Sequence, residues 1–459
     1  MAILTNKFKR EQIQLLMNNF LDSSSNHYYI GIGRSDTWNT TDDAPDAEST
    51  LLEERLFRNN LQSVKKVADV SFIVPRYNWT SGSTYSAYND AQVGFPTNTY
   101  YVMNDNNQVY MVIQQAKNAN GAGQPSTIQP SGNTDGTTFI TADDYAWKFL
   151  YSISALDASK YIAAGFLPVK LQGATTGSSQ ASDVEQLAVQ TAAVDGQILG
   201  YVLDSGGSGY TTAPTLTIAG DGTKAKATAT EIGGIITKVE VTDSASTLCL
   251  GSGYRNAVVT QAGGSPDKPA KIRPIFAVKG GVGADPRVDL RSNGIMFTVK
   301  PAGTETGDFI IGNDFRQVGL IRNIKDSDGT YGTEPEGALF TNPTGTALKQ
   351  LVFASAGTQF TADKRIQGQT SLTEALIDRV DSINVWYHQN DDTGYASFSQ
   401  NENVQEVDGS GNKDLINTTG YFVEPEVGTL TGDVLYIDNR ASVTRASDQT
   451  EDIKIVIQI

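Results

Sequence analysis

Cysteine is almost absent from the sequence, which has only Cys249 among its 459 residues. A disulfide within the chain is therefore excluded, and a large chain with one thiol is typical of proteins that fold in a reducing cytosol. Long apolar runs are absent too, since none approaches the roughly 20 residues needed to span a bilayer. Residues 1–7 show no apolar core followed by a cleavage site, so we expect a soluble protein without a signal peptide.

Basic residues are few relative to acidic ones. The chain has 35 lysines and arginines against 51 aspartates and glutamates, which gives a formal net charge of −16. Binding to nucleic acid needs a basic surface, and binding to anionic lipid needs basic clusters. We therefore expect neither a nucleic-acid partner nor insertion into a membrane. The acidic balance favours solubility at high concentration before assembly.

Histidine occurs only twice, and the residue patterns of common catalytic and metal sites are missing. His27 and His388 each lie alone in a strand-like stretch, where a histidine is usually packed or at the surface and only in a minority of cases a metal ligand or base. The sequence contains no H-E-x-x-H, no paired cysteines and no G-x-S-x-G. The run Gly280-Gly281-Val282-Gly283 lacks the lysine of a phosphate loop and predicts a structural turn. We expect no catalytic residue, no metal and no cofactor.

Acidic residues form no recognisable acid–base pair or calcium loop. Asp326-Ser327-Asp328-Gly329 begins like an EF-hand loop, but the twelfth position is Gly337 and not glutamate. The adjacent pairs Asp42-Asp43, Asp143-Asp144 and Asp391-Asp392 would point to opposite faces of a strand, and solvated loops explain them. A glycosidase needs two carboxylates that face each other across a cleft. The sequence leaves that arrangement open without indicating it.

The residues that are present are typical of a mainly β chain of two or three domains. The 44 glycines, with frequent Asn, Ser and Thr, suit short strands and many turns. Apolar residues at helical spacing predict a helix over residues 13–20, and the capping-box pair Thr50 and Glu53 predicts the start of a second. Residues 371–381 fit either a short helix or a strand. Period-2 or short apolar stretches predict strands over residues 27–33, 67–74, 100–103, 109–113, 275–278, 295–299, 383–388, 434–437 and 453–459.

An internal repeat interrupts this pattern. Ser205-Gly206-Gly207-Ser208-Gly209-Tyr210 is echoed by Leu250-Gly251-Ser252-Gly253-Tyr254, and the two tyrosines are 254 − 210 = 44 residues apart. Apolar stretches precede and follow each copy, so each copy predicts a strand, a glycine turn with a tyrosine plug, and a second strand. Two copies are few for a solenoid. We therefore predict a small β module inserted in the main fold.

Residues 308–322 are the stretch around which the chain is organised. The apolar run over residues 308–311, the turn residues Gly312, Asn313 and Asp314, and the apolar residues that follow predict two strands joined by a tight turn. Gly319 marks a bulge or a close backbone approach. Arg316 and Arg322 lie within apolar sequence. Either they extend to the surface, or they are interface arginines held by carboxylates of a partner subunit.

Four segments of the sequence resemble segments of one protein family, and the agreement lies in how many there are and in the order in which they occur. They are residues 75–82 (PRYNWTSG), residues 144–151 (DYAWKFLY), residues 308–322 and residues 432–440 (GDVLYIDNR), which closes with residues 449–454. The chain resembles the gene-eight baseplate wedge proteins of T-even-like contractile-tailed bacteriophages. The resemblance covers most of the chain outside about residues 181–270.

The resemblance implies a mainly β fold with two β-sandwich-like domains and a few short helices. Residues 1–180 and 271–459 would be the N-terminal and C-terminal parts of the wedge-protein fold, and residues 181–270 would be the inserted glycine/tyrosine β-repeat module. It also implies a non-enzymatic structural subunit of the virion tail baseplate, present in the host cytoplasm during assembly. Such a subunit forms a homodimer, links neighbouring wedge proteins and transmits the rearrangement on host contact.

The interface candidates are arginines and tryptophans in the main fold: Arg34, Trp38, Arg76, Trp79, Arg316 and Arg322. The insert departs from the T-even pattern, and it could be a decoration, a spacer or the site of an extra partner. A receptor-binding or adhesin-like tail protein that recognises surface glycans is the alternative, and it predicts a trimer. A glycan-degrading enzyme is the third class.

Overall fold

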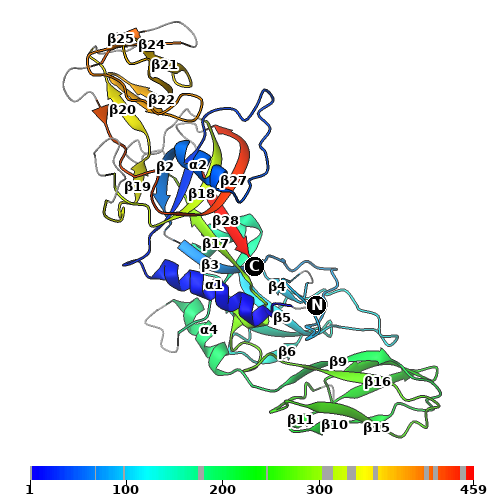
Figure 1. The fold of residues 1–459 in the computed structure, drawn as a ribbon. Helices are drawn as coiled ribbons and strands as arrows, with labels where there is room; N and C mark the ends of the chain where they lie inside the picture. The colour runs from blue at the N-terminus through cyan, green and yellow to red at the C-terminus, as the bar shows by residue number, and fades with distance from the viewer. Residues whose placement is uncertain are drawn as a thin grey trace. The chain divides into compact units, whose positions relative to one another are not determined.

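The computed structural model describes residues 3–67, 69–96, 99–173, 180–243, 247–301, 314–327, 337–354, 360–407, 413–416, 422–444 and 451–459. The fold is mainly β, with 41% of the described residues in strands and 12% in helices, which confirms the predicted fold class. Figure 1 shows the strands as several separate sheets. The predicted strand over residues 308–311 and its turn at Gly312 and Asn313 lie outside the described residues.

The helices are short apart from the first. Thr50 caps α2 by accepting a hydrogen bond from the backbone N–H of Glu53 at 3.1 Å, so the predicted helix start is confirmed. The first predicted helix is also present as α1. Among the described residues the α-helices are α1 (Asn6–Leu21), α2 (Leu51–Asn59), α3 (Ala155–Tyr161), α4 (Ala181–Thr191) and α5 (Pro286–Asp289), with one 3-10 turn at Ile162–Ala164.

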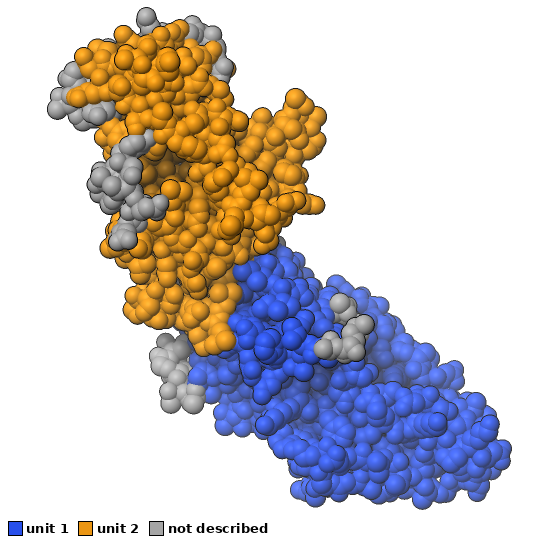
Figure 2. Space-filling view, in the orientation of Figure 1, with its two compact units in different colours: residues 1–14, 71–296, 456–459 blue, residues 15–70, 297–455 orange. Residues whose placement is uncertain are grey.

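The chain divides into two compact units. Unit 1 comprises residues 1–14, 71–296 and 456–459, and unit 2 comprises residues 15–70 and 297–455 (Figure 2). The division falls within α1 and within β3 (Asp69–Pro75), β17 (Gly294–Val299) and β28 (Ile453–Gln458). These three strands and β8 (Phe166–Val169) form a four-stranded sheet of order β28-β17-β3-β8. The expected boundaries at 180/181 and 270/271 both lie inside unit 1.

Unit 2 is built on two antiparallel sheets. The five-stranded sheet has the order β19 (Thr344–Thr346), β2 (Leu61–Lys66), β1 (Tyr28–Gly33), β18 (Asp314–Arg322) and β27 (Asp433–Thr444). The seven-stranded sheet has the order β25 (Lys413–Leu415), β24 (Asn403–Glu406), β21 (Arg365–Gly368), β22 (Glu374–Asp381), β23 (Asn384–His388), β20 (Lys349–Val352) and β26 (Phe422–Val423). Residues 374–381 are therefore a strand, which resolves the open choice for residues 371–381.

Strand β18, which lies between β1 and β27, is buried along seven of its nine residues. Gly319 on this strand pairs with Gly31 on β1, and both glycines lie against the ring of Phe57 from α2. A Cβ at Gly319 would lie 2.3 Å from a ring atom of Phe57, so the predicted close approach is confirmed. The strand is enclosed by packing on both faces, which leaves little room for a polar side chain without a partner.

Unit 1 has an aromatic core on another antiparallel sheet. The sheet order is β4 (Tyr101–Met103), β5 (Gln108–Gln114), β7 (Ala146–Ser152) and β6 (Thr138–Ile140). Trp147 from β7 is fully buried there with Tyr145 stacked on it, 5.4 Å between ring centroids. Val189 of α4 belongs to the same cluster, so α4 packs with this sheet.

The repeat forms a module of nested antiparallel strand pairs (Figure 1, green). From the outermost pair inward these are β9 (Ile198–Ser205) with β16 (Lys271–Phe276), β10 (Thr215–Gly220) with β15 (Ala257–Ala262), β11 (Thr223–Ala225) with β14 (Leu250–Ser252), and β12 (Thr228–Ile232) with β13 (Ile235–Glu240). The paired strands span residues 198–276, and α4 packs against β7 of the core sheet.

The two repeat copies adopt matching backbone conformations. Gly207 and Gly209 have φ of 67° and 77°, and Gly251 and Gly253 have φ of 65° and 78°. These positive values favour glycine, which explains the glycine pattern in both copies. The tyrosines that follow, Tyr210 and Tyr254, are 4% and 3% exposed. Each copy is thus a glycine turn with a buried tyrosine, as predicted.

Each repeat copy forms a backbone hydrogen bond with the segment that precedes the other copy. The backbone N–H of Tyr210 donates to the carbonyl of Gly234, just before the strand that precedes the second copy, at 3.1 Å. The backbone N–H of Tyr254 donates to the carbonyl of Gly196, just before the strand that precedes the first, at 3.0 Å. Gly222 and Gly264 lie against the rings of Tyr254 and Tyr210 respectively. Neither copy is complete without the other, which accounts for the presence of two.

Replacing Tyr210 with phenylalanine should destabilise the module by about 1–3 kcal/mol, because its hydroxyl is buried in two hydrogen bonds. That hydroxyl donates to Gln261 Oε1 at 2.5 Å and accepts from the Ala270 N–H at 2.7 Å. Tyr254→Phe is the matched control, because the Tyr254 hydroxyl accepts only a 3.4 Å bond from the Ala225 N–H. Amide hydrogen exchange of residues 198–276 in the full chain measures both. If the two variants lost the same protection, the two hydrogen bonds of the Tyr210 hydroxyl would not be what stabilises the module.

Candidate functional site

Residues 34–43, which follow β1, form a loop that unit 2 holds through charged groups. Arg316 on β18 is the first of these groups, with a side chain only 5% exposed. Its Nε donates to the Asp42 carboxylate at 2.8 and 2.9 Å, its Nη2 donates to Asp314 Oδ2 at 3.2 Å, and its Nη1 donates to the Ser35 carbonyl. The expectation that Arg316 reaches the surface is wrong, because β18 is an interior strand of its sheet and Arg316 lies in its buried part. The carboxylates that hold it belong to its own chain.

Asp42 connects the arginine to the loop backbone. Its Oδ1 also accepts a hydrogen bond from the backbone N–H of Trp38 at 3.0 Å. The hydrogen bond from Arg316 is the main reason that the pKa of Asp42 is lowered, and the Trp38 N–H adds to it. The interpretation of Asp42-Asp43 as a merely solvated pair is therefore wrong for Asp42, which fixes the loop in place.

His388 on β23 anchors the other side of the loop. Its Nδ1 lies 2.7 Å from Asp378 Oδ2, and its Nε2 lies 3.7 Å from Asp36 Oδ2. Burial alone would lower the pKa of His388, but the two carboxylates outweigh it and raise the pKa to about 10. The imidazole is thus a buried cation at neutral pH and cannot serve as a general base there. Ser35 Oγ donates to Asp378 Oδ1 at 3.1 Å, so this hydroxyl is directed to the carboxylate and not to the histidine.

A β-bulge in β22 directs the Asp378 side chain toward His388 and Ser35. The register between β22 and β23 shifts between Ile377 and Arg379, and both Ile377 and Asp378 are fully buried. Successive residues of a regular strand point to opposite faces, so two consecutive buried side chains reflect the bulge. Asp378 also accepts from Gln62 Nε2 of β2 at 3.1 Å. The alternation of apolar and polar residues around His388 could not reveal Asp378 or Gln62, because both lie on other strands.

Arg34 and Trp38 lie together on the outer side of the loop. The Arg34 guanidinium lies 4.1 Å from the centroid of the Trp38 ring, within cation–π range. Trp38 Nε1 donates to the carbonyl of Arg440 on β27 at 2.8 Å. Both side chains are half-buried, so the stacked pair presents a partly apolar, partly charged surface. We call these two residues the Arg34–Trp38 platform.

The remaining candidates lie elsewhere. Arg322 donates to Asp433 Oδ2 at 2.7 and 3.1 Å in an exposed pair of unit 2, as expected for an arginine that reaches solvent. Arg76 and Trp79 belong to unit 1, where Arg76 donates to the Ile162 carbonyl at 2.9 Å and Trp79 Nε1 donates to Ser126 Oγ at 3.1 Å. The structure therefore brings together Arg34, Trp38 and Arg316 of the six. Sequence reasoning gave Asp42 and His388 no role in a site and did not single out Asp36 and Asp378, because the partners of these residues are distant in sequence.

Arg316, His388 and their carboxylate partners hold the loop of residues 34–43 in place. Within the described ranges, no group of three or more histidine, cysteine or acidic side chains is arranged to hold a metal ion. No described helix is long and apolar enough to cross a membrane. His27 is packed, with its ring nitrogens 2.8 Å from the carbonyls of Phe340 and Ser23. The chain matches no protein-family model, and no curated protein matches it.

Proposed function

We propose that the chain is a structural subunit of a contractile-tail baseplate, which links neighbouring subunits and transmits their rearrangement on host contact. The family resemblance of four ordered segments motivates this function, and the mainly β fold is compatible with it. The strongly acidic composition suits a component that must stay soluble before it assembles. We propose no catalytic activity for it.

The observation that carries the proposal is the fixed Arg34–Trp38 platform. Tryptophan and arginine are the residues most enriched among energetic anchors of protein interfaces. The loop that bears them is fastened by Arg316 through Asp42 and by His388 through Asp36. A surface that is already ordered loses little conformational entropy on binding, so it suits a permanent contact. The occupant we propose is a second copy of the chain, related by a two-fold axis.

Replacing Trp38 with alanine should weaken this self-association at least tenfold. Trp386→Ala is a matched control, because Trp386 is also half-buried in unit 2 and has the Arg379 guanidinium 4.6 Å from its ring centroid. Analytical ultracentrifugation of both variants over a concentration series measures the dissociation constant. Equal weakening by both substitutions, or no weakening by Trp38→Ala, would remove the platform from the interface. Circular dichroism checks that each variant is folded.

The glycan-binding alternative loses one of its supports. It drew on the tyrosines of the repeat, but Tyr210 and Tyr254 are buried plugs and cannot stack on a sugar. Trimeric assembly with affinity for surface glycans would still favour that alternative.

A further inference from the structure

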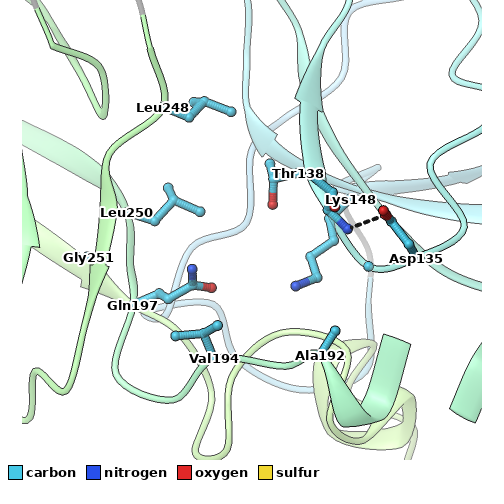
Figure 3. Close-up of a pocket in the computed structure, with 11 residues that line it drawn as sticks. Asp135, Thr138, Lys148, Ala192, Val194, Gln197, Leu248, Leu250 and Gly251 are labelled. Carbon is cyan, nitrogen blue, oxygen red and sulfur yellow. Dashed lines mark hydrogen bonds between the residues drawn. The ribbon is translucent and has the colours of Figure 1, made fainter. Parts of the chain in front are cut away.

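A cavity of about 330 Å³ lies within unit 1, where the core sheet meets Gln197, just before β9, and the start of the second repeat copy (Figure 3). Its walls come from the segment before β6, from β7, from the residues after α4 and from β14. Lys148 on β7 extends its amine into this space, on the side where Gln197 lies. Leu248 and Leu250 line another part of the wall. The cavity thus combines one cation with an apolar surface.

Lys148 is the unusual member of this site. It is only 3% exposed, and no described residue lies within hydrogen-bonding or ion-pair distance of its Nζ. Burial lowers the pKa of Lys148, against the opposing fields of Asp289 and Asp135. Burying an ammonium group without a partner costs several kcal/mol. A negatively charged group from outside the chain could therefore pair with the Lys148 ammonium and offset this cost.

The two nearest carboxyl groups do not supply that charge. Asp289 is fully buried and accepts from the Gly283 N–H at 2.8 Å, while its Oδ1 has no partner among the described residues. Burial raises the pKa of Asp289 to about 8, so it is mostly protonated at neutral pH. Asp135 Oδ1 accepts a hydrogen bond from the backbone N–H of Thr137 at 2.9 Å. Neither carboxyl group forms an ion pair with Lys148.

The other wall residues restrict the class of ligand. Gln197 Oε1 is buried without a partner in the described structure, so no hydrogen bond to this oxygen fixes the orientation of the amide. Only the Nε2 side of that amide can donate to an anionic guest. Leu248, Leu250 and Val194 favour a short apolar chain. Asp135 at the rim disfavours a dianion by charge repulsion. A carboxylate could accept hydrogen bonds from Lys148 Nζ and from Gln197 Nε2.

We propose that this cavity binds a small monocarboxylate with a short apolar tail, its carboxylate on Lys148 and its tail against Leu248 and Leu250. The proposal is independent of the baseplate function, because every lining residue belongs to unit 1 and the Arg34–Trp38 platform belongs to unit 2. Failure of either proposal leaves the other in place.

The test is calorimetric titration of the full chain with butyrate, with butylamine as a probe of similar size and opposite charge. Butyrate should bind with a dissociation constant on the order of 1 mM, and butylamine should not bind. Lys148→Met should weaken butyrate binding at least tenfold. Lys170→Met is the control, because Lys170 is paired with Asp183 at 2.6 Å and lies outside the cavity. Unchanged binding by Lys148→Met, or equal binding of butylamine, would overturn the proposal.

A second measurement needs no variant. Butyrate should protect Lys148 in the native chain from acetylation by acetic anhydride, as read from the modified peptides by mass spectrometry. Lys170, at the same butyrate concentrations, should be modified at an unchanged rate. Equal modification of Lys148 with and without butyrate would overturn the proposal even if Lys148→Met failed to fold.

Discussion

Asp378→Ala lowers the free energy of unfolding of unit 2 by about 3–5 kcal/mol, the usual cost of leaving one member of a buried ion pair uncompensated. Asp378 is fully buried, and it holds His388, Gln62 and Ser35 through its two oxygens. Its loss would leave the imidazolium with only Asp36, at 3.7 Å. Hydrogen exchange of peptides from residues 374–390 reports this loss locally.

The matched control is Asp433→Ala, which breaks the exposed pair with Arg322. Surface ion pairs contribute roughly 0–1 kcal/mol, so this variant should be nearly neutral. The double variant Asp378→Asn with His388→Gln replaces the charged pair with a neutral one, and it should be less destabilised than Asp378→Ala. A loss of under about 1 kcal/mol for Asp378→Ala would mean that the network is not a clamp.

His388 also sets a pH window for unit 2. Its folded pKa of about 10 lies above the unfolded value of 6.5. The stabilisation that it contributes is therefore fully present below pH 6.5 and is lost as the pH rises through 10. His388→Gln should remove this alkaline component of the loss, measured as local exchange protection of residues 374–390 between pH 6 and 10.

Asp289→Asn should stabilise unit 1 at pH 8.5 by several kcal/mol relative to the unsubstituted chain. The folded pKa of Asp289 is about 8 against an ordinary 3.8, because burial disfavours its charged form, with Asp285 raising it and Lys148 opposing. Between these values the unfolded chain ionises first, so stability falls as the pH rises through that window, at up to about 1.4 kcal/mol per pH unit. Asparagine cannot ionise and keeps an oxygen for the Gly283 N–H.

Urea unfolding at pH 4, 6 and 8.5, followed by exchange protection of residues 283–292, measures this effect. The difference between the variant and the unsubstituted chain should grow with pH and level off above pH 8. Asp105→Asn is a suitable control because Asp105 is exposed and should leave the pH dependence unchanged. A difference that does not change with pH would show that Asp289 is ionised in the folded state.

Local patterns predicted the elements well and their long-range partners poorly. The capping pair Thr50 and Glu53, the helical spacing over α1 and the alternation over β23 each involve residues close in sequence. The glycine turns of the repeat were readable for the same reason, because positive φ restricts the residue type. The pairing of β9 with β16, by contrast, depends on closure of a long segment and leaves no local signal.

The site was harder to predict because its charges are neutralised across strands. Arg316 lies in an apolar stretch whether its partner belongs to the same chain or to another, so the sequence left both interpretations open. The structure shows that Asp42 and Asp314 hold it. His388 looked like a solitary packed histidine because Asp36 lies in a loop more than 300 residues earlier and Asp378 occupies a bulge.

The central claim is that this chain assembles as a structural subunit through a self-complementary surface. Light scattering of the purified full chain, over a range of concentrations that includes those of assembly, measures its solution mass most directly. The account predicts the mass of two chains, which Trp38→Ala reduces toward one. A mass of one chain at all concentrations would contradict it, and a mass of three would favour the receptor-binding alternative.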